Sequence, residues 1–573
     1  MQPLPIPSAL LCVHLRRTST MSRRSIRARA APLTLAEEQA GRDLVAQELL
    51  DLRRAMLQSL EPDIEDDSDE EPVDDGVSSS SDDDADEKEN APPPSAWSTT
   101  CVPVKAPPLS VASAAQLPSH HVSTELGYLQ CLLTEQTVAA IATNPAAYAH
   151  SKGWPATWQT SAQELWLFIA VHIYMGIVRL PRAHMYWEDS WRQSFVIDSF
   201  SRQRFTELLR FFHIAPPTPA GTRHTVIDKV NTLLTACQQS FSSCYLPTQH
   251  LAFDEAMVGY NGRDRMKQYL RSKPTRWSYK VWCLACDGYL LNFDVYKGKQ
   301  QRQSDNVSLH DTVLNLVRPY ANRGHILFLD NLFPSPALFD HLQRIGIRAC
   351  GTLRPNRKDV PSDLQQKGKE LAKGGTATWQ RGELGCLAWS DRQLVYLLST
   401  HASIDAFVSF EQARDNETTV TVTKPKVVHD YNLHRGKVDT VDQLRGNYAL
   451  GRKSMKNWPS LAWWLIDMCI VNAFHLFTLQ THSSASQLDF RIQLMHQLAA
   501  AYPPQRDHEQ HGGPPHRGRP PHPHYPALSS TIADCVHCSR QSVQRRRSKY
   551  TCDHCHVHLC VTPCFKQYHA RQH

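Results

Sequence analysis

The chain contains 573 residues, and its hydrophobic content of 41% is enough for several folded domains with buried cores. Its longest apolar runs are Leu165 to Val178 and Leu461 to Leu479. The first is too short for a membrane span of about 20 apolar residues, and the second is interrupted by Asp467, Asn472 and His475. Both runs are therefore predicted to be buried helices, and we expect no membrane partner.

The net charge of +6 hides a strong asymmetry along the chain. Glu61 to Asn90 holds 16 acidic residues and one lysine, so this tract carries −15 and the remaining chain carries +21. A basic folded body predicts a polyanionic partner, most simply nucleic acid, with ordinary solubility as the alternative. The acidic tract has almost no large apolar residues, so we expect it to be disordered. Ser68 and Ser81, each followed by acidic residues, are candidate sites for an acidic-directed kinase.

The N-terminal residues argue against export. Met1 to Arg17 hold a short apolar patch that is followed by its arginines, the reverse of the order in a secretory signal. Translation from Met21 is an open alternative to translation from Met1. Up to residue 118 the chain is a Pro/Ser/Asp-rich leader, for which we expect disorder.

From Thr124 the apolar periodicity becomes helical. Ser161 to Glu164 has the sequence of a capping box at the start of Leu165 to Val178, and Ser201 precedes an amphipathic run that includes Phe205 and Phe212. The period changes at Leu251, where three segments rich in Val, Leu, Ile and aromatic residues predict short strands. These strands are Ser278 to Asp287, Tyr289 to Tyr296 and His325 to Leu329.

Helical character returns later in the chain. Val441 to Leu450 and Ser460 to Leu479 are predicted helices, and a Pro/His/Gly-rich linker follows at residues 501–530.

The isolated pair Cys283 and Cys286 lies within one predicted strand, where buried structural thiols explain it better than a metal.

The last 39 residues contain six of the sixteen cysteines, interleaved with histidines. Two C-x-x-C pairs at this separation predict zinc, because successive knuckles present thiolates to one tetrahedral ion. Eight ligands suffice for two ions: Cys535, Cys538, Cys552, Cys555, Cys560, Cys564 and His569, with His558 or His573 as the eighth. A disulfide framework is the alternative, but the basic run Arg545 to Lys549 and the lack of a credible signal peptide favour a chain inside the cell.

Four acidic residues, at three places in the chain, are candidates for a second kind of metal site. Asp254 and Asp330 each end an apolar strand, and Asp439 and Asp442 share one face at the start of a predicted helix. Turn, N-cap or helix-dipole roles explain each acid taken alone. Oxygen ligands with no nearby histidine or thiolate would select Mg²⁺ or Mn²⁺.

Motifs around these acids carry a resemblance to a known family. They are Phe253 to Met257, Gly262 with Arg263, Lys267 with Tyr269, Lys273 with Pro274, Leu329 to Phe333, Gly351 to Arg357 and Val438 to Gln443. In order and spacing this set resembles piggyBac transposases. The resemblance runs from about Thr124 to Phe477 and resumes in the terminal Cys/His segment.

The resemblance implies an α/β RNase H-like catalytic core with an inserted subdomain. This core would be embedded in a mostly α-helical dimerisation and DNA-binding domain, and a small cross-brace zinc finger of RING or PHD type would follow. The implied boundaries are 1–118 for the leader, 119–249 and 443–500 for the two parts of the helical domain, 250–358 and 428–442 for the core, 359–427 for the insertion, 501–530 for the linker and 531–573 for the zinc-binding domain.

The resemblance also implies a mechanism. Asp254, Asp330 and Asp439 would hold two Mg²⁺ or Mn²⁺ ions, with Asp442 as a fourth required acid, for cut-and-paste transposition of double-stranded DNA into TTAA targets. A homodimer and a nuclear location are expected. Candidate DNA contacts are Arg263, Lys267, Lys273, Arg276, Arg452, Lys453, Lys456, Arg545, Arg546 and Arg547, with Trp458 stacking on an unpaired base.

Two other functions stay open at this point. A domesticated DNA-binding or chromatin protein without transposition activity has the same motifs, and only the presence of all four acids speaks for retained chemistry. A RING-like ubiquitin ligase explains the cysteine segment but leaves the upstream motifs unexplained.

Overall fold

The computed structural model describes residues 96–573 except 111, 118–121, 218–223, 272, 274, 299–307, 416–417, 453, 455, 505–525, 541–545, 553–556, 562–563 and 571–573. The acidic tract, Met21, Ser68 and Ser81 lie outside the described residues, so their predictions stay untested.

A helical block precedes the first long strand, as the periodicity from Thr124 predicts. Its elements are α2 (Glu125–Leu132), α3 (Glu135–Ser151), α4 (Ala162–Ile177), the 3-10 turn η1 (Ala183–Trp187), α5 (Ser194–Ser199), α6 (Arg202–Phe211) and α7 (Val226–Ser243). Hydroxyl N-caps begin most of them. Ser161 Oγ accepts from the Glu164 amide and Ser201 Oγ accepts from the Arg204 amide, so both predicted helix starts are confirmed.

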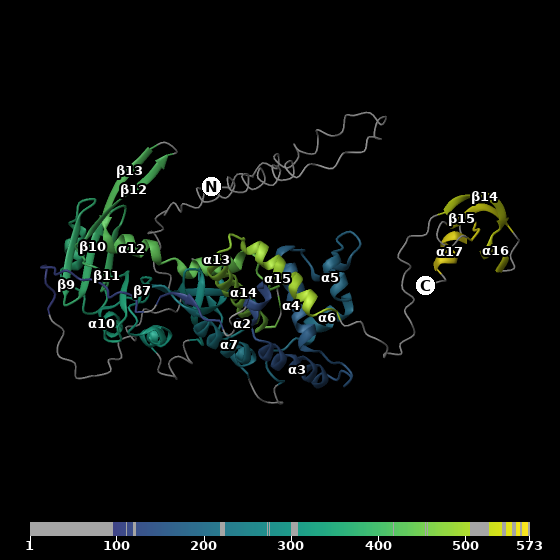
Figure 1. Cartoon of the computed structure of the whole chain (residues 1–573), viewed down its shortest axis with the longest axis horizontal. Coiled ribbons are helices and arrows are strands. Elements are labelled where there is room, and N and C mark those ends of the chain that lie inside the picture. Colours follow the sequence, from purple (N-terminus) through teal and green to yellow (C-terminus); the bar gives the residue numbers. More distant parts are fainter. Residues whose placement is uncertain are drawn as a thin grey trace. The chain divides into compact units, whose positions relative to one another are not determined.

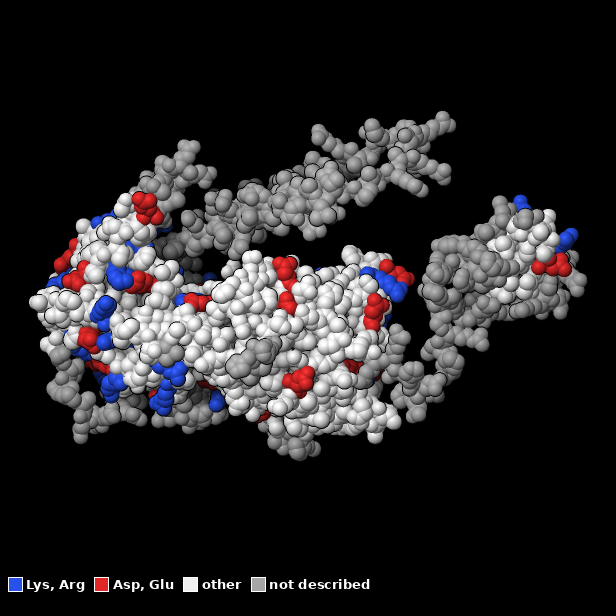
Figure 2. All heavy atoms as spheres, in the orientation of Figure 1, with Lys and Arg blue, Asp and Glu red and all other residues white. Residues whose placement is uncertain are grey.

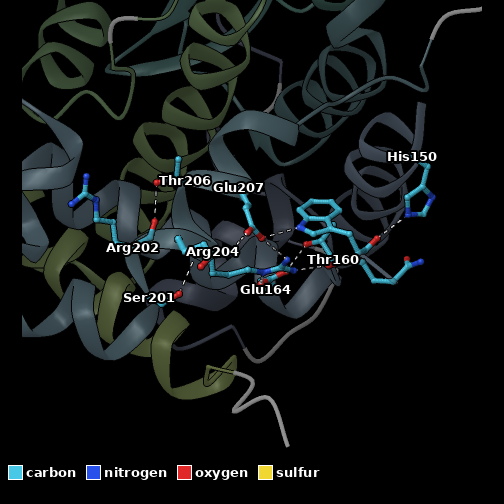
Figure 3. Close-up of polar contacts among 11 residues, drawn as sticks. His150, Thr160, Glu164, Ser201, Arg202, Arg204, Thr206 and Glu207 are labelled. Atoms are coloured by element: carbon cyan, nitrogen blue, oxygen red, sulfur yellow. Dashed lines mark hydrogen bonds and ion pairs between the residues drawn. The ribbon is translucent and has the colours of Figure 1, made fainter. Parts of the chain in front are cut away.

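The Glu164 carboxylate ties α4 to α6. Arg204 donates from Nε to Glu164 Oε1 at 2.6 Å and from Nη2 to Glu164 Oε2 at 2.7 Å, and its guanidinium lies 4.9 Å from the Trp158 ring centroid (Figure 3). Trp158 in turn donates from its ring nitrogen to Glu207 on α6. This cluster fixes the angle between the two helices through charge-assisted hydrogen bonds.

A nine-stranded sheet forms the centre of the α/β region (Figure 1). Its strands are β3 (His250–Gly259), β4 (Gln268–Tyr269), β5 (Trp277–Cys286), β6 (Tyr289–Val295), β7 (Ile326–Leu329), β8 (Arg348–Thr352), β9 (Thr376–Arg381), β10 (Leu384–Ser390) and β11 (Leu394–Ser399). The spatial order is β4-β5-β3-β7-β8-β11-β10-β9, and β6 pairs with β5. The three strands predicted from sequence are confirmed as β5, β6 and β7.

The pairing directions define two parts of this sheet. Strands β3, β7 and β8 run parallel, whereas β5 is antiparallel to β3 and β6 is antiparallel to β5. Strands β9 to β11, which the sequence assigns to the insertion, continue the same sheet because β11 pairs antiparallel with β8. The hairpin of β12 (Phe407–Asp415) and β13 (Thr418–Pro425) follows and extends away from the sheet in Figure 1.

Helices connect and cover these strands. They are α9 (Leu309–Val317), the 3-10 turn η2 (Arg318–Tyr320), α10 (Pro336–Arg344), α11 (Leu364–Lys369), α12 (Lys426–His434), α13 (Lys437–Asn447), α14 (Pro459–Thr481) and α15 (Gln487–Ala501). Helix α13 packs on β3 and β5, and α14 packs against α2, α7 and β6. Within the described residues, α14 is long and apolar enough to cross a membrane, but 78% of its apolar window is buried inside the fold. The prediction of a buried helix is therefore supported.

Residues 96–117 correct the predicted extent of the leader. They lie in extended conformation along the body. Ser98 pairs with Gln380 on β9, Ala106 donates to the His401 carbonyl, and β1 (Ala114–Ala115) pairs with β2 (Tyr245–Leu246). Because these backbone groups are satisfied by the body, disorder does not extend to residue 118. Periodicity alone cannot detect a strand whose partners lie far away in sequence.

The C-terminal module consists of β14 (Pro526–Asp534), α16 (Val536–Arg540), β15 (Arg547–Cys552) and α17 (Cys564–Ala570). Strands β14 and β15 pair antiparallel, and Cys535, Leu559, Cys564 and Tyr568 form the buried cluster of the module. Such a small apolar core is too little to stabilise a domain of this size unaided, which is typical of metal-supported modules.

Candidate active site and metal centre

Asp254 and Asp330 lie at equivalent positions on adjacent parallel strands. Phe253 and Leu329 are the last pair of the parallel ladder between β3 and β7, and each aspartate directly follows its member of this pair. Asp330 ends its strand as predicted. Asp254 does not, because β3 continues to Gly259 with β5 as its antiparallel partner. The longer strand holds the backbone of Asp254 from one side.

The charges of three aspartates converge at this edge. Burial raises the pKa of Asp254 to about 7, and the negative charges of Glu255, Asp330 and Asp439 add to the effect. One hydrogen bond lowers the pKa of Asp254: the Glu255 backbone N–H donates to Asp254 Oδ1 at 2.7 Å. Helix α13 packs on β3, which agrees with an effect of the Asp439 charge on Asp254.

Helix α13 presents the remaining predicted acids. Asp439 lies in its first turn and is exposed, and Asp442 one turn later is half-buried. Burial raises the pKa of Asp442 and the charge of Asp439 raises it further, whereas Arg445 lowers it. Arg445 Nε lies 3.3 Å from Asp442 Oδ1. The two acids are three residues apart in α13, a spacing that puts them on neighbouring positions of the helix surface, as predicted.

Lys437, the first residue of α13, has a role that the sequence did not indicate. Its side chain is buried, and Nζ donates to Asp287 Oδ1 at 2.5 Å and to the His250 backbone oxygen at 3.0 Å. Asp287 lies in the turn between β5 and β6 and also accepts from Thr248. One lysine thus joins α13, the start of β3 and the β5–β6 turn. A lysine in the first turn of a predicted helix, where it opposes the helix dipole, was the signal available in the sequence.

Glu255 connects the acidic site to a basic segment. Its carboxylate oxygens lie 3.7 Å from Lys273 Nζ and 3.6 Å from Lys280 Nζ, so both lysines are held at the residue that follows Asp254 in β3. Residues 260–280 contain seven Lys or Arg residues and one acid, a net charge of +6.

In Figure 2, charged side chains gather over the end of the body that carries β9 to β11 and α10, whereas the helical part of this face shows few Lys or Arg.

The predicted DNA contacts divide into three groups. The first group is exposed and consists of Arg263, Arg276, Arg546 and Arg547, of which Arg547 also donates from Nη2 to the Ile532 backbone oxygen at 2.9 Å. Partly covered and already hydrogen-bonded within the chain are Lys267, Lys273, Arg452 and Lys456. Outside the described residues are Lys453 and Arg545. Arg452 donates to the Leu180 backbone oxygen and to the Tyr186 hydroxyl, which gives it a structural role as well.

The predicted stacking role of Trp458 is contradicted by its burial. The side chain is 3% exposed and packs between Phe212, at 5.7 Å between ring centroids, and His213, at 5.2 Å. Trp458 is the N-cap residue of α14. A ring in the core cannot receive a nucleotide base.

The C-terminal cysteines form one compact quartet. The sulfur atoms of Cys535, Cys538, Cys560 and Cys564 all lie within 4.8 Å of one another, and Cys538 Sγ lies 3.3 Å from Cys564 Sγ. A tetrahedral zinc with Zn–S bonds of about 2.3 Å places its sulfurs roughly 3.8 Å apart, so the quartet fits this ion. These four cysteines are free, which removes the disulfide alternative for them.

Hydrogen bonds already favour thiolate at one corner of the quartet. Burial acts to raise the pKa of the Cys535 thiol, but backbone N–H groups of Cys538 and Cys560 point at its sulfur and lower the pKa to about 7. The Cys560 amide donates to Cys535 Sγ at 3.4 Å. Burial and the neighbouring thiols raise the pKa of Cys560 to about 11, a repulsion that a bound cation relieves.

The quartet combines the first cysteine pair, Cys535 and Cys538, with the third pair, Cys560 and Cys564. It does not include the second pair, Cys552 and Cys555. Cys552 is buried but is not a member of the quartet, and the side chains of Cys555, His569 and His573 lie outside the described residues. His558 Nδ1 lies 2.9 Å from the Ser548 backbone oxygen, which leaves Nε2 as its ligand atom. The skipped pair agrees with the cross-brace arrangement that the resemblance implies. The second ion stays a prediction.

The isolated pair Cys283 and Cys286 is structural, as predicted. Both side chains are buried in β5, and Cys286 lies 3.0 Å from the Thr248 hydroxyl. Within the described part of the chain, the C-terminal quartet is the one group of three or more ligating residues whose donor atoms all lie within 4.8 Å of one another. The aspartates are more widely spaced, which suits a site for more than one ion.

Comparisons with known proteins agree with this geometry. Residues 124–474 match the Transposase IS4 family. The chain is 26% identical over 491 residues to the human PiggyBac transposable element-derived protein 3, covering 82% of this chain and 78% of that protein. It is also 26% identical over 363 residues to the human PiggyBac transposable element-derived protein 2, covering 61% of each.

A solved structure has the same fold. It is a piggyBac transposase in a synaptic complex with hairpin DNA, determined by cryo-EM, and it matches with a TM-score of 0.60 and 20% identity over 78% of this chain and 98% of that chain. The family match covers more than half of the chain and includes Asp254, Asp330, Asp439 and Asp442. The chain belongs to the Transposase IS4 family, as a piggyBac-type member.

Proposed function

We propose that this protein is a piggyBac-like DNA transposase that binds the terminal inverted repeats of its element, cleaves DNA and joins the ends to TTAA targets. The observation that carries the proposal is the placement of Asp254 and Asp330 directly after the last parallel pair of β3 and β7, with the charge of Asp439 acting on Asp254. Paired carboxylates held at one sheet edge are the arrangement that metal-assisted phosphoryl transfer requires.

The strand order supports an RNase H-like core. Strands β6, β5, β3, β7 and β8 are adjacent in that order, with β3, β7 and β8 parallel and β5 and β6 antiparallel. Residues 359–427 are the insertion in this core, and the flanking helices form the dimerisation and DNA-binding domain. Helix α13 then supplies the third aspartate from the far side of the insertion.

Asp254, Asp330 and Asp439 would hold two Mg²⁺ or Mn²⁺ ions, which supply activation of a water or 3′-hydroxyl nucleophile and stabilisation of the leaving oxygen. The raised pKa of Asp254 fits such a site, because mutual repulsion among carboxylates is what a divalent cation relieves. The aspartates bind and orient and need not transfer protons themselves. Asp442 faces the Met257 backbone and Arg445, so it positions α13.

Basic side chains orient the DNA. Glu255 holds Lys273 and Lys280, and the exposed Arg263 and Arg276 add positive charge near the β4–β5 edge. Contacts of this kind position phosphates without reading base sequence. In the C-terminal module, Arg545 to Arg547 would contact terminal-repeat DNA, and the module would hold two zinc ions. We further propose a homodimer located in the nucleus, with Ser68 and Ser81 as kinase sites.

The test uses purified full-length protein, Mg²⁺ and a duplex that carries the terminal repeats of its own element flanked by TTAA. Wild type is expected to nick at the repeat ends, and Asp330→Ala is expected to bind the ends with unchanged affinity while losing cleavage. The matched control is Asp405→Ala, an exposed aspartate in the loop between β11 and β12. Cleavage by Asp330→Ala at the wild-type rate would contradict the catalytic assignment.

A second function is a domesticated DNA-binding protein. The names of the human relatives describe transposable element-derived proteins. End binding by wild type without any cleavage on matched ends would favour this function over transposition.

A further inference from the structure

Tyr269 and Trp277 form an exposed aromatic pair at the edge of the nine-stranded sheet. They face each other across the β4–β5 pairing, with ring centroids 4.7 Å apart and ring planes at 53°. Tyr269 is 44% exposed and Trp277 43% exposed. Of the strongly exposed aromatic side chains in the described residues, which also include Trp191 and Phe407, these two are ring neighbours. Two large rings left in solvent side by side indicate a binding surface.

The pair is held in place by its strand and by a cation. Cross-strand aromatic pairs stabilise a two-residue edge strand such as β4, and the Leu270 amide closes the hairpin through the Arg276 carbonyl. Lys267 Nζ lies 4.2 Å from the Trp277 ring centroid and also donates to the Gly262 backbone oxygen at 2.6 Å. Trp277 is thereby braced from one side, and its ring supports Tyr269.

The surroundings of the pair are strongly positive. Arg263, Arg265, Arg271 and Arg276 are exposed in the same segment, which carries a net charge of +6 over residues 260–280. The single acid there, Asp264, accepts from the Asn457 side chain and from the Met266 amide. Aromatic rings within such a surface are complementary to a nucleobase joined to a phosphodiester, and far less so to the apolar face of another protein.

We infer that Tyr269 and Trp277 form a stacking platform for an unpaired DNA base. The inference rests on the proposed function as a DNA transposase and adds a base contact to it. It also replaces the stacking role predicted for Trp458, whose ring is buried. A ring stacks on any base, so the platform holds displaced single-stranded DNA and does not select sequence.

The register of β5 sets the distance to the acidic site. Asp254 pairs with Cys283, six residues beyond Trp277 on the same strand. Six strand residues span about 20 Å, which matches roughly six nucleotide steps of B-form DNA. The platform therefore contacts a nucleotide several steps away from the phosphate at the aspartates, where strand separation would leave a base unpaired.

The experiment measures DNA binding by the full chain without Mg²⁺, so that it does not depend on cleavage. The probe is a mixed-sequence 12-nucleotide single strand with an internal 2-aminopurine, compared with the same strand annealed to its complement. Stacking on the platform quenches 2-aminopurine fluorescence. Tyr269→Ala and Trp277→Ala are expected to weaken single-strand binding by about 5- to 100-fold and to abolish the quenching, while duplex affinity stays within twofold.

Three variants separate stacking from other effects. Tyr269→Phe keeps the ring and is expected to bind as wild type does, whereas Tyr269→Leu keeps apolar bulk without a ring and is expected to lose the quenching. Trp191→Ala removes an exposed aromatic of similar accessibility, 51% exposed, from the helical block and is expected to change nothing. Thermal melting of each variant confirms that the edge hairpin remains folded.

Several outcomes would overturn the inference. Unchanged single-strand affinity and quenching in both alanine variants would show that the pair is no platform. Equal losses on single strand and duplex would show a contact to the backbone or groove. Unchanged DNA binding together with a changed oligomeric state by light scattering would assign the pair to a contact with a second copy of the chain. A protein that quenches 2-aminopurine through Tyr269 yet never cleaves would retain the platform and lose only the transposase proposal.

Discussion

Lys437 Nζ lies 2.5 Å from Asp287 Oδ1, and this contact joins the first turn of α13 to the β5–β6 turn. Burial acts to raise the pKa of Asp287, but hydrogen bonds from Lys437 and Thr248 outweigh it and lower the pKa to about 2. A lysine at a helix N-terminus opposes the helix dipole. Its hydrogen bonds to Asp287 and to the His250 backbone oxygen indicate that it positions α13, and therefore Asp439, relative to β3.

Replacement of Lys437 by methionine is predicted to weaken metal binding at the aspartates. The helix start loses its link to Asp287 and His250, so Asp439 is held less firmly. We expect the Mn²⁺ affinity measured by electron paramagnetic resonance to fall about 10-fold, the size typical of residues that orient metal ligands. Lys437→Arg should retain part of the affinity. Lys369→Met, at an exposed lysine on α11, is the control, and equal affinities for the Lys437 and Lys369 methionine variants would contradict the role.

The ion pair between Arg491 and Asp467 is predicted to be essential for the helical domain. Both side chains are fully buried, and Arg491 Nη2 lies 3.2 Å from Asp467 Oδ1 while the Leu450 amide donates to Asp467 Oδ2 at 2.9 Å. Arg491→Met leaves a buried carboxylate without its partner and should cost about 3–5 kcal/mol in a urea titration. Combining it with Asp467→Leu should recover part of this loss. A double variant as unstable as the sum of the two single variants would contradict coupling.

The buried His172 is predicted to make the folded protein less stable in acid. Burial lowers its pKa to about 3, with a Phe168 carbonyl contact acting against the shift, and its ring stacks on Trp463 at 4.1 Å between centroids. The unfolded state takes up the proton first, so the stability contributed by neutral His172 is present above about pH 6.5 and is lost as the pH falls toward 3. His172→Phe should flatten the dependence of the melting temperature on pH over this window. His224→Phe, at an exposed histidine, should leave it as steep as in wild type.

Lys456 is predicted to make DNA binding weaker as the pH rises above about 8. Burial lowers its pKa to about 8, the positive charge of Arg210 lowers it further, and its Nζ donates to the Arg210 backbone oxygen at 2.6 Å. Its charge is present below pH 8 and is lost as the pH rises through that value. Affinity for a 20-base-pair duplex at fixed salt should fall about fivefold more between pH 7 and 9 in wild type than in Lys456→Arg. Parallel curves for the two proteins would show that Lys456 does not contact phosphate.

Zinc removal tests the C-terminal module. Wild type should contain two zinc ions per chain by mass spectrometry of the metal, and Cys560→Ser, which opens the quartet, should release one of them. Cys552→Ser should release the other, because Cys552 lies outside the quartet. Cys101→Ser, at a thiol beside Thr378, is the control and should retain both. A single ion in wild type would contradict the second site.

The sequence by itself determined the change from helical to strand pattern near Leu251 and singled out the candidate acidic and thiol ligands. Capping residues such as Ser161 and Ser201, and the nearly continuous apolar run of β5, act over a few residues, so local pattern is sufficient to predict them. The C-x-x-C spacing likewise depends only on local chain geometry. Motif resemblance then connected Asp254, Asp330 and Asp439, which are far apart in the chain.

The tertiary structure decided which side chains are available. Burial is set by elements distant in sequence, so Trp458 lies in the core against Phe212, whereas Trp277 lies in solvent beside Tyr269. Residues 96–117 are ordered because their partners come from β9, the loop after β11 and β2. The hydrogen bond from Lys437 to Asp287 joins residues that are 150 positions apart in the sequence. Pattern within a window cannot foresee such pairings, because they depend on how the sheet brings separate segments together.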